Sequence, residues 1–283
     1  MAKHETVDGV VVRVRDVGDH DRYLSVLTAE SGRITMLSKG SHSVRSPQVA
    51  VSQLYTYGNF EYYRKGSMNI LKGGSAIHPF YALSSDIDRL NLATYLCEVT
   101  SELTDEGEPA EEMLRLLLNS FHAICTEKYS QEQIKGAFEL RAAAISGYAP
   151  DLSGCCRCGC VDAELFYLDV MNGALVCESC RKKGNAAPLP SAYADELREA
   201  EILGILPAAA CAAFRYCVQA PLSRLLSFEL TDAQDMECFS KLAQTYLLSH
   251  IGHGFESLNF YQSMRRASME TGVYPQNQKK EQV

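Results

Sequence analysis

The segment CCRCGCVDAELFYLDVMNGALVCESC occupies residues 155–180 and contains two pairs of cysteines with matching spacing. Two residues separate Cys155 from Cys158, two separate Cys177 from Cys180, and eighteen residues lie between the pairs. This spacing is typical of a zinc site, because each pair wraps the ion from a tight turn and tetrahedral Zn²⁺ takes four thiolates. Four thiolates leave no open position for water or substrate, so we expect one structural zinc ion.

The residues between the two pairs favour a small zinc ribbon. Residues 165–168 and 173–176 predict two short strands, and Gly159 and Gly173 suit the turns beside them. We therefore predict a zinc-finger insert at about residues 153–185.

Other assignments of these cysteines stay open. Cys156 or Cys160 could replace a ligand of the first pair, and four thiolates could hold an iron–sulfur cluster. A redox dithiol is a further alternative, although the βαβ setting typical of that motif is not evident. His250 and His253 are three residues apart, but without a third ligand we interpret them as ordinary helix-end histidines.

The N-terminal region has the alternation of β-strands. Val10, Val12 and Val14 alternate with their neighbours, and turn residues follow at 30–32 and 65–66. The predicted strands cover about residues 10–15, 22–28, 33–39, 54–63 and 68–71. Five short strands favour a small closed barrel, of which the oligonucleotide-binding OB-fold is one example. Another small barrel or an open sheet is the alternative.

Positive charge concentrates in the same region. Residues 1–80 contain 10 lysines and arginines against 7 acidic residues, whereas the whole chain has a net charge of −8. Cations that follow phosphates and rings that stack on bases together hold single-stranded nucleic acid. The candidate DNA-binding residues are Arg13, Arg15, Arg33, Lys39, Arg45, Arg64 and Lys65, and the candidate rings are Tyr55, Tyr57, Phe60, Tyr62 and Tyr63. About half of these rings must point into the barrel, since they occupy both faces of one strand.

Helical periodicity begins after residue 79. Apolar residues three and four apart mark the faces of several helices, the second of which has Pro109 just inside its start. Helices are predicted to resume at about residue 192 after the cysteine segment. The clearest apolar stripes lie at about residues 92–103, 114–124, 134–145, 239–247 and 256–267.

The sequence lacks the common signatures of catalysis. It contains no phosphate-binding loop, HExxH, GxSxG or GxGxxG motif, so we expect that the protein is not an enzyme. It also contains no run of 18 apolar residues and no apolar signal segment near its start. Together with eleven cysteines, these features predict a cytoplasmic protein whose thiols bind metal and do not form disulfides.

Several stretches of the chain resemble the bacterial recombination protein O (RecO) family. The similarity runs over about residues 5–265, and its most specific part lies between residues 138 and 180. The matching stretches are LTAESGR at 27–33 with Lys39-Gly40, FELR at 138–141, GYAP at 147–150, the first cysteine pair with Gly159, and IGH at 251–253. Cys156 and Cys160 are additional to the family pattern, and His42 occupies a loop that is commonly more basic.

The resemblance implies an α+β multidomain fold. An OB-fold DNA-binding domain is expected over residues 1–80 and an all-helical domain with the zinc-finger insert over 81–270. A disordered tail is expected over 271–283.

The resemblance also implies a recombination mediator of the RecF pathway. Such a protein binds single- and double-stranded DNA, anneals complementary strands and acts at the nucleoid. With RecR it helps RecA replace single-strand-binding protein (SSB), whose C-terminal tail it contacts. Two other hypotheses compete with it. The barrel could bind a protein in place of DNA, in a zinc-braced interaction scaffold, or the cysteine pairs could serve a thiol oxidoreductase.

Overall fold

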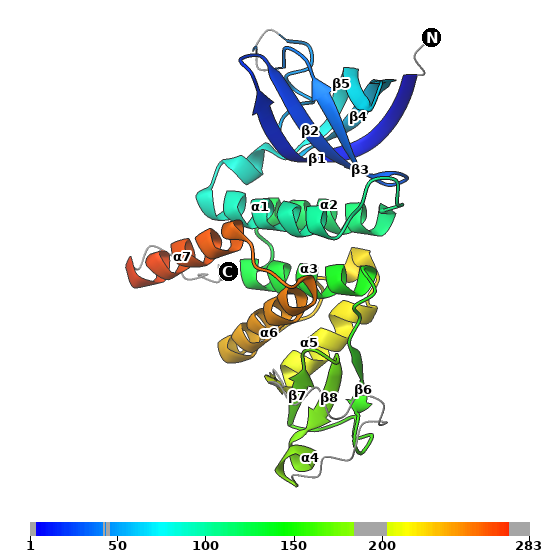
Figure 1. Ribbon diagram of the computed structural model, residues 1–283. Coiled ribbons are helices and arrows are strands. Elements are labelled where there is room, and N and C mark those ends of the chain that lie inside the picture. The colour runs from blue at the N-terminus through cyan, green and yellow to red at the C-terminus, as the bar shows by residue number, and fades with distance from the viewer. Residues whose placement is uncertain (1–3, 42, 44–45, 184–202, 272–283) are drawn as a thin grey trace.

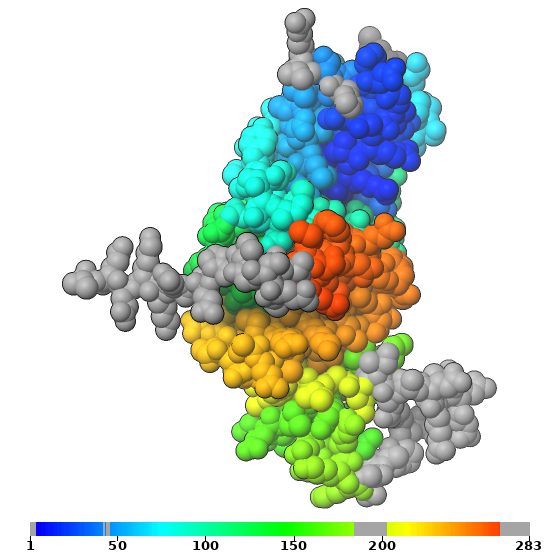
Figure 2. Space-filling model, turned by 90° about the vertical axis from the view of Figure 1, so that its left-hand side faces the viewer, coloured from blue at the N-terminus to red at the C-terminus, as the bar shows by residue number. Residues whose placement is uncertain are grey.

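The computed structural model describes residues 4–41, 43, 46–183 and 203–271. Its elements form three parts in a row: a β-barrel, a layer of helices and a small β-sheet (Figure 1). The side view shows the same succession along the long direction of the molecule (Figure 2). The predicted α+β architecture is confirmed.

The N-terminal part is a closed barrel. Its strands are β1 (His4–Val17), β2 (Asp21–Thr28), β3 (Gly32–Ser38), β4 (Thr56–Lys65) and β5 (Met68–Pro79). They pair in the order β1-β2-β3-β5-β4, and β4 returns to β1. All pairings are antiparallel except that of β3 with β5. The five-stranded barrel with this crossover is the predicted OB-fold.

Alternation along the strands builds the barrel core. On β4, Gly58, Phe60 and Tyr62 are buried while the residues between them are partly exposed, as the two-residue period of a strand requires. Phe60 packs inside the barrel with Leu24, Val26 and Met36 among others. Strand β5 continues far beyond its predicted end at residue 71, because it pairs with the whole length of β4.

The middle part is helical. It contains η1 (Tyr81–Ser84), α1 (Ile87–Glu102), α2 (Glu111–Thr126), α3 (Gln131–Ile145), α5 (Ala208–Gln219), η2 (Leu222–Arg224), α6 (Ala233–Ile251) and α7 (Glu256–Thr271). Asp86 caps α1 and Ser130 caps α3, because their side chains accept backbone N–H groups of the first turn. Pro109 lies just before Ala110, the N-cap of α2, and not inside the helix as predicted.

The far end is a four-stranded sheet. Strands β6 (Asp151–Cys155), β7 (Leu165–Asp169), β8 (Ala174–Cys177) and β9 (Leu203–Pro207) adopt the order β6-β8-β7-β9, and α4 (Glu178–Lys182) follows β8. Residues 203–207 were expected to be helical but form an edge strand. Five residues are too few to show a period, and their conformation comes from pairing along β7. The rest of the segment expected to resume as helix, 192–202, lies outside the described residues.

Two hydrophobic cores hold these parts together. The smaller one fills the barrel, and the larger one runs from the outer face of the barrel through the helices to the sheet. Val10 and Leu27 of the barrel belong to the larger core, as do Phe121 of α2 and Phe166 of β7. In the part of the chain that the structure describes, no helix is both long and apolar enough to cross a membrane. The tail expected to be disordered lies outside the described residues, except for Thr271, which ends α7.

Candidate nucleic-acid interface and metal centre

A basic groove crosses the outer face of the barrel. It has a volume of ≈ 270 Å³ and is lined by Arg13, Arg15, Tyr23, Ser25, Arg33, Thr35 and Glu106, which we call the arginine groove. Three of the seven predicted DNA-binding residues therefore meet in one place. Its volume lies below the ~300–1,000 Å³ of typical small-molecule pockets, so it suits part of a polymer better than a whole cofactor.

Strand register explains why these side chains share a face. Arg13 lies opposite Ser25, and Arg15 lies opposite Tyr23, across the antiparallel β1–β2 pair. The guanidinium of Arg15 lies 5.3 Å from the centre of the Tyr23 ring. A guanidinium over an aromatic ring is a favourable cation–π arrangement. The pair brings an aromatic ring and a positive charge together on the outer face of the barrel.

The arginines of the groove keep their charge available. None of the ion pairs between described residues involves Arg13, Arg15 or Arg33. Arg22 on the same sheet differs, because its Nε donates to Asp16 Oδ1 at 2.9 Å. Unpaired guanidiniums on one face attract phosphate groups, which Arg holds in bidentate fashion.

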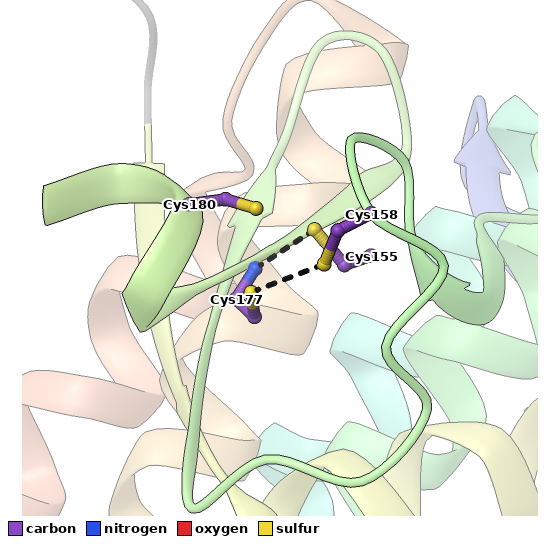
Figure 3. Close-up of side chains that lie close together, drawn as sticks. All are labelled: Cys155, Cys158, Cys177 and Cys180. Carbon is purple, nitrogen blue, oxygen red and sulfur yellow. Dashed lines mark hydrogen bonds between the residues drawn. The ribbon is translucent and has the colours of Figure 1, made fainter. Parts of the chain in front are cut away.

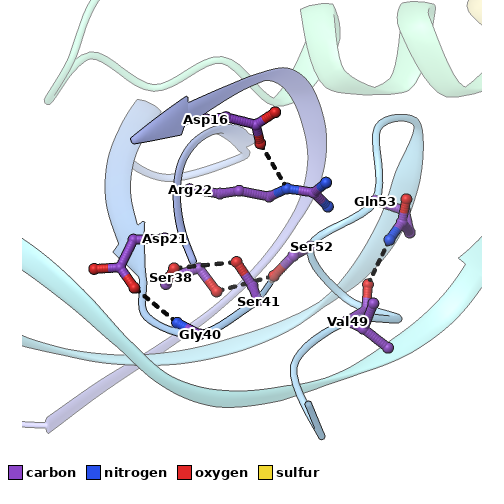
Figure 4. Close-up of polar contacts among 9 residues, drawn as sticks. All are labelled: Asp16, Asp21, Arg22, Ser38, Gly40, Ser41, Val49, Ser52 and Gln53. Atoms are coloured by element: carbon purple, nitrogen blue, oxygen red, sulfur yellow. Dashed lines mark hydrogen bonds and ion pairs between the residues drawn. The ribbon is translucent and has the colours of Figure 1, made fainter. Parts of the chain in front are cut away.

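Lys39 follows β3 in a loop that is held by polar contacts (Figure 4). Its neighbour Ser38 contacts the hydroxyl of Ser52 at 3.0 Å, and the N–H of Gly40 donates to Asp21 at 2.8 Å. The lysine side chain itself is exposed. Arg45, also predicted to bind DNA, lies outside the described residues, as does His42.

Arg64 and Lys65 are exposed at the β4–β5 hairpin, apart from the groove lining. Met68, which pairs with Lys65, receives a hydrogen bond from the Tyr23 hydroxyl at 3.9 Å. The hairpin that carries Arg64 and Lys65 therefore adjoins the groove at Tyr23.

The candidate rings in and just before β4 lie mainly in the interior. Tyr55, Phe60 and Tyr62 are buried, whereas Tyr57 and Tyr63 are half-buried. The ring inside the arginine groove is Tyr23 of β2, which the sequence analysis did not single out. In the sequence, Tyr23 precedes the apolar Leu24 on a predicted strand. This alternation places the two side chains on opposite faces, with Leu24 inside and Tyr23 outside.

The second site is a cluster of four cysteines at the tip of the sheet (Figure 3). The sulfur atoms of Cys155, Cys158, Cys177 and Cys180 all lie within 4.8 Å of one another. Cys158 and Cys177 form one close pair among them, with sulfurs 3.7 Å apart. Zn–S bonds of about 2.3 Å in a tetrahedron would place sulfurs about 3.8 Å apart. The cluster could thus hold one metal ion.

The local fold prepares these thiols for a cation. Burial opposes ionisation of Cys155, but backbone N–H groups of Cys177, Arg157 and Cys158 donate to its sulfur, and the net effect lowers its pKa to about 6. Hydrogen bonding with Cys158, together with burial and its other cysteine neighbours, raises the pKa of Cys180 to about 12. Four such thiols ionise together only when a cation compensates their charges. Gly159, at φ 70°, allows the turn after the first pair.

The flanking candidates take no part in the cluster. Cys156 is exposed, and the thiol of Cys160 donates to the carbonyl of Asp162 at 3.2 Å. His250 contacts the carbonyl of Tyr246, and His253 lies 3.2 Å from Glu102. Among the described residues, these four side chains belong to no potential metal-binding group.

Arg215 of α5 joins the sheet to the helices. Its Nε donates to the carbonyl of Leu152 at 2.7 Å, and its terminal nitrogen donates to that of Val161 at 3.0 Å. The same guanidinium lies 5.5 Å from the centre of the Phe166 ring. Because Cys155 and Cys177 are part of the larger core, an ion in the cluster would brace the helical part as well.

Two family models match consecutive parts of this chain. The model described as Recombination protein O N terminal matches residues 1–80, and that described as Recombination protein O C terminal matches residues 84–201.

Several curated relatives carry the name DNA repair protein RecO. One from Acetivibrio thermocellus is 26% identical over 258 residues, which are 91% of this chain and 96% of that relative. Another from Alkaliphilus metalliredigens is 30% identical and covers 61% of this chain and 70% of that relative. A third from Streptomyces avermitilis is 30% identical and covers 64% and 76%. With both family models matched in order along one barrel-and-helix fold, the chain belongs to the recombination protein O family.

Proposed function

We propose that this protein is a DNA-binding recombination mediator. Its family membership supports a function in DNA repair by recombination. The mediator binds single- and double-stranded DNA and anneals complementary strands. Together with RecR it helps RecA replace SSB on single-stranded DNA.

The arginine groove is the observation that carries this proposal. Three guanidiniums and a ring lie on the outer face of strands β1–β3, the face through which OB-folds commonly bind oligonucleotides. Phosphates are held by the charges of Arg13, Arg15 and Arg33, and bases stack on Tyr23. Lys39, Arg64 and Lys65 extend the positive surface, and Arg45 is assigned to the same role.

The cysteine cluster is proposed to hold one structural zinc ion through Cys155, Cys158, Cys177 and Cys180. Thiolate ligands suit Zn²⁺, and a site with four of them is closed to substrate. This supports a bracing role and a protein that is not an enzyme. The domains proposed are residues 1–80 for DNA and 81–270 for the helical part, with the finger at about 153–185.

A mediator of this kind works through simultaneous contacts. By binding both DNA and the C-terminal tail of SSB, it raises the effective concentration of each for the other without hydrolysing a nucleotide. We place the SSB tail and RecR among its partners, RecA as an indirect one, and its site of action at the bacterial nucleoid in the cytoplasm.

The test compares two triple variants with equal changes in charge. The first, Arg13→Glu, Arg15→Glu and Lys39→Glu, alters the proposed surface. The second, Arg115→Glu, Lys128→Glu and Lys241→Glu, alters exposed cations on α2, on the loop after it and on α6. Binding to a labelled single-stranded oligonucleotide is measured across a salt series, with zinc analysis of the same samples.

We expect the barrel variant to lose most of its affinity and the helix variant to keep it. Affinity of the wild type should fall by about 0.7 log units per log unit of salt for each phosphate contacted. If both variants bind as the wild type does, the assigned surface is wrong. If the wild type itself fails to bind at low salt while holding zinc, the barrel is better explained as a protein-binding module of a scaffold.

A further inference from the structure

A carboxylate from the helical part lines the arginine groove. Glu106 belongs to residues 103–110, the loop between α1 and α2, which we call the docking loop (Figure 1). This loop reaches the β2–β3 hairpin, where Glu106 forms a β-bridge with Gly32. The groove is therefore built by two parts of the chain that are distant in sequence.

Backbone hydrogen bonds on both sides fix the position of Glu106. The N–H of Arg33 donates to the carbonyl of Asp105 at 3.2 Å, and the N–H of Gly107 donates to that of Ser31 at 2.9 Å. A side chain at residue 32 would not fit, because its Cβ would lie 2.0 Å from the Asp105 carbonyl oxygen. These contacts hold the backbone beside the arginines independently of the Glu106 side chain.

A carboxylate in a phosphate-binding groove has specific chemical consequences. It only accepts hydrogen bonds and repels a phosphate placed beside it. The exocyclic amino groups of cytosine, adenine and guanine can donate a hydrogen bond to it. Thymine carries a carbonyl oxygen where cytosine carries that amino group, and its one ring N–H lies between two carbonyl oxygens, which a carboxylate repels.

We propose that Glu106 selects unpaired bases that carry an amino group, and thereby gives the groove a preference for cytosine-containing over thymine-only single strands. The inference rests on the proposed binding of DNA to this groove. A base that stacks on Tyr23 presents its edge to Glu106, while Arg13, Arg15 and Arg33 hold the flanking phosphates. In duplex DNA neighbouring base pairs cover the faces of each base, so this mode requires single-stranded DNA.

The experiment measures the affinity of the full-length protein for oligo-dC and oligo-dT of equal length. Both are flexible homopolymers, and they differ at the amino group in question. Wild type is compared with Glu106→Gln and Glu106→Ala. Glu108→Gln is the control, since it removes the same charge from an exposed position of the docking loop that does not line the groove. Far-ultraviolet circular dichroism verifies that all variants fold.

We expect wild type and Glu108→Gln to bind oligo-dC about fivefold to tenfold more tightly than oligo-dT. In Glu106→Ala the preference should disappear. In Glu106→Gln it should shrink mainly through tighter oligo-dT binding, because the amide N–H can donate to a thymine carbonyl oxygen, which the carboxylate repels. Equal affinities in the wild type, or a preference that survives in both Glu106 variants, would overturn the inference while leaving DNA binding intact. Failure of the wild type to bind either strand would count against the proposed function itself.

Discussion

Arg33 is a guanidinium of the arginine groove that comes from β3, at the edge touched by the docking loop. Its side chain has no ion-pair partner among the described residues, so its charge is open to a phosphate. Changing Arg33 to alanine should remove about one phosphate contact. The plot of log affinity against log salt for single-stranded DNA should become shallower by about 0.7.

Arg22→Ala is the matched control for Arg33→Ala. Arg22 lies on the neighbouring strand, but its charge is already paired with Asp16 at 2.9 Å. Its removal should change the slope much less. Equal slopes for the two variants would mean that Arg33 contributes no more to phosphate binding than the ion-paired Arg22 does.

A buried charge pair in α3 is joined to α1 by a tyrosine hydroxyl. Lys135 Nζ lies 2.9 Å from Glu139 Oε1, and the hydroxyl of Tyr95 donates to the same oxygen at 2.7 Å. All three residues are buried, with Glu139 fully so. Burial raises the pKa of Glu139, whereas the nearby Lys135 and Tyr95 lower it. Each charge of this buried pair is compensated by the other. Removing one of them leaves the other unpaired in the core and lowers the stability of the protein.

Glu139→Ala should therefore destabilise the protein by about 3–5 kcal/mol, because it leaves Lys135 charged and unpaired in the core. The measurement is urea unfolding followed by circular dichroism. The double variant Glu139→Leu with Lys135→Met removes both charges and should recover most of the loss. A double variant as unstable as the single one would show that packing, and not the charge, dominates.

At the scale of elements, the sheet β6–β9 carries the cysteine cluster at its tip. Cys155 ends β6, and Cys177 ends β8 directly before α4. If the cluster holds the proposed zinc ion, replacing Cys177 with serine should abolish zinc binding and lower the thermal midpoint, because a structural ion contributes its binding free energy to folding. Zinc analysis and thermal unfolding of the purified variant test this.

Cys156→Ser supplies the control, since Cys156 neighbours Cys155 but lies outside the cluster. It should retain a full complement of metal. Retention of metal by Cys177→Ser, or its loss from Cys156→Ser, would show that the ligand set is wrong.

The β2–β3 hairpin and the docking loop meet through a glycine. Gly32 has a φ of 58°, and a Cβ there would meet the Asp105 carbonyl. Gly66, at the tip of the β4–β5 hairpin, has a φ of 63°, and a Cβ there would meet no atom within 4 Å. Alanine at either position carries a left-handed strain of about 1–2 kcal/mol.

Comparing the two alanine variants separates strain from contact. Gly66→Ala should lose stability through strain alone, whereas Gly32→Ala should lose clearly more because the docking loop must move. Chemical unfolding measures both. Gly32→Ala should also weaken the oligo-dC preference, since Glu106 moves with the loop. Equal losses of stability would mean that the docking loop can move away from a side chain at residue 32 with no loss of folding free energy.

At the scale of the whole molecule, the larger core joins the outer face of the barrel to the helices. Tyr55 packs its ring against Phe121 of α2, with centres 5.4 Å apart, and its hydroxyl lies 2.7 Å from that of Thr94 in α1. Burial is the main reason that the pKa of Tyr55 is raised. Tyr55 also has a φ of 63°, a conformation that a bulky residue adopts only when its surroundings hold it there.

Tyr55→Ala should cost about 3–5 kcal/mol, as truncation of a buried aromatic side chain does. Hydrogen exchange should then accelerate in both the barrel and α1–α2, because both lose a common support. Tyr57→Ala, at a half-buried ring two residues away, should have a smaller effect. Acceleration confined to the barrel would indicate that the two parts unfold independently.

Local patterns were sufficient for much of this fold. The apolar stripe of α6, which includes Phe239, Leu242 and Tyr246, appears in the structure as a buried face. Strand β9 could not be predicted from local patterns, because its conformation depends on pairing with the edge of β7 and not on its own five residues.

The chain by itself determined the barrel strands, the main helices and the four cysteines that converge, because periods and spacings are local properties. Tertiary structure decided which cations share a groove, placed Tyr23 among them and sent the β4 rings Phe60 and Tyr62, with the neighbouring Tyr55, inward. It also brought Glu106 to that groove from a loop more than seventy residues beyond Arg33. The physical reason is that the two faces of a strand are equivalent until the barrel closes and the helices pack against it, which buries one face and exposes the other.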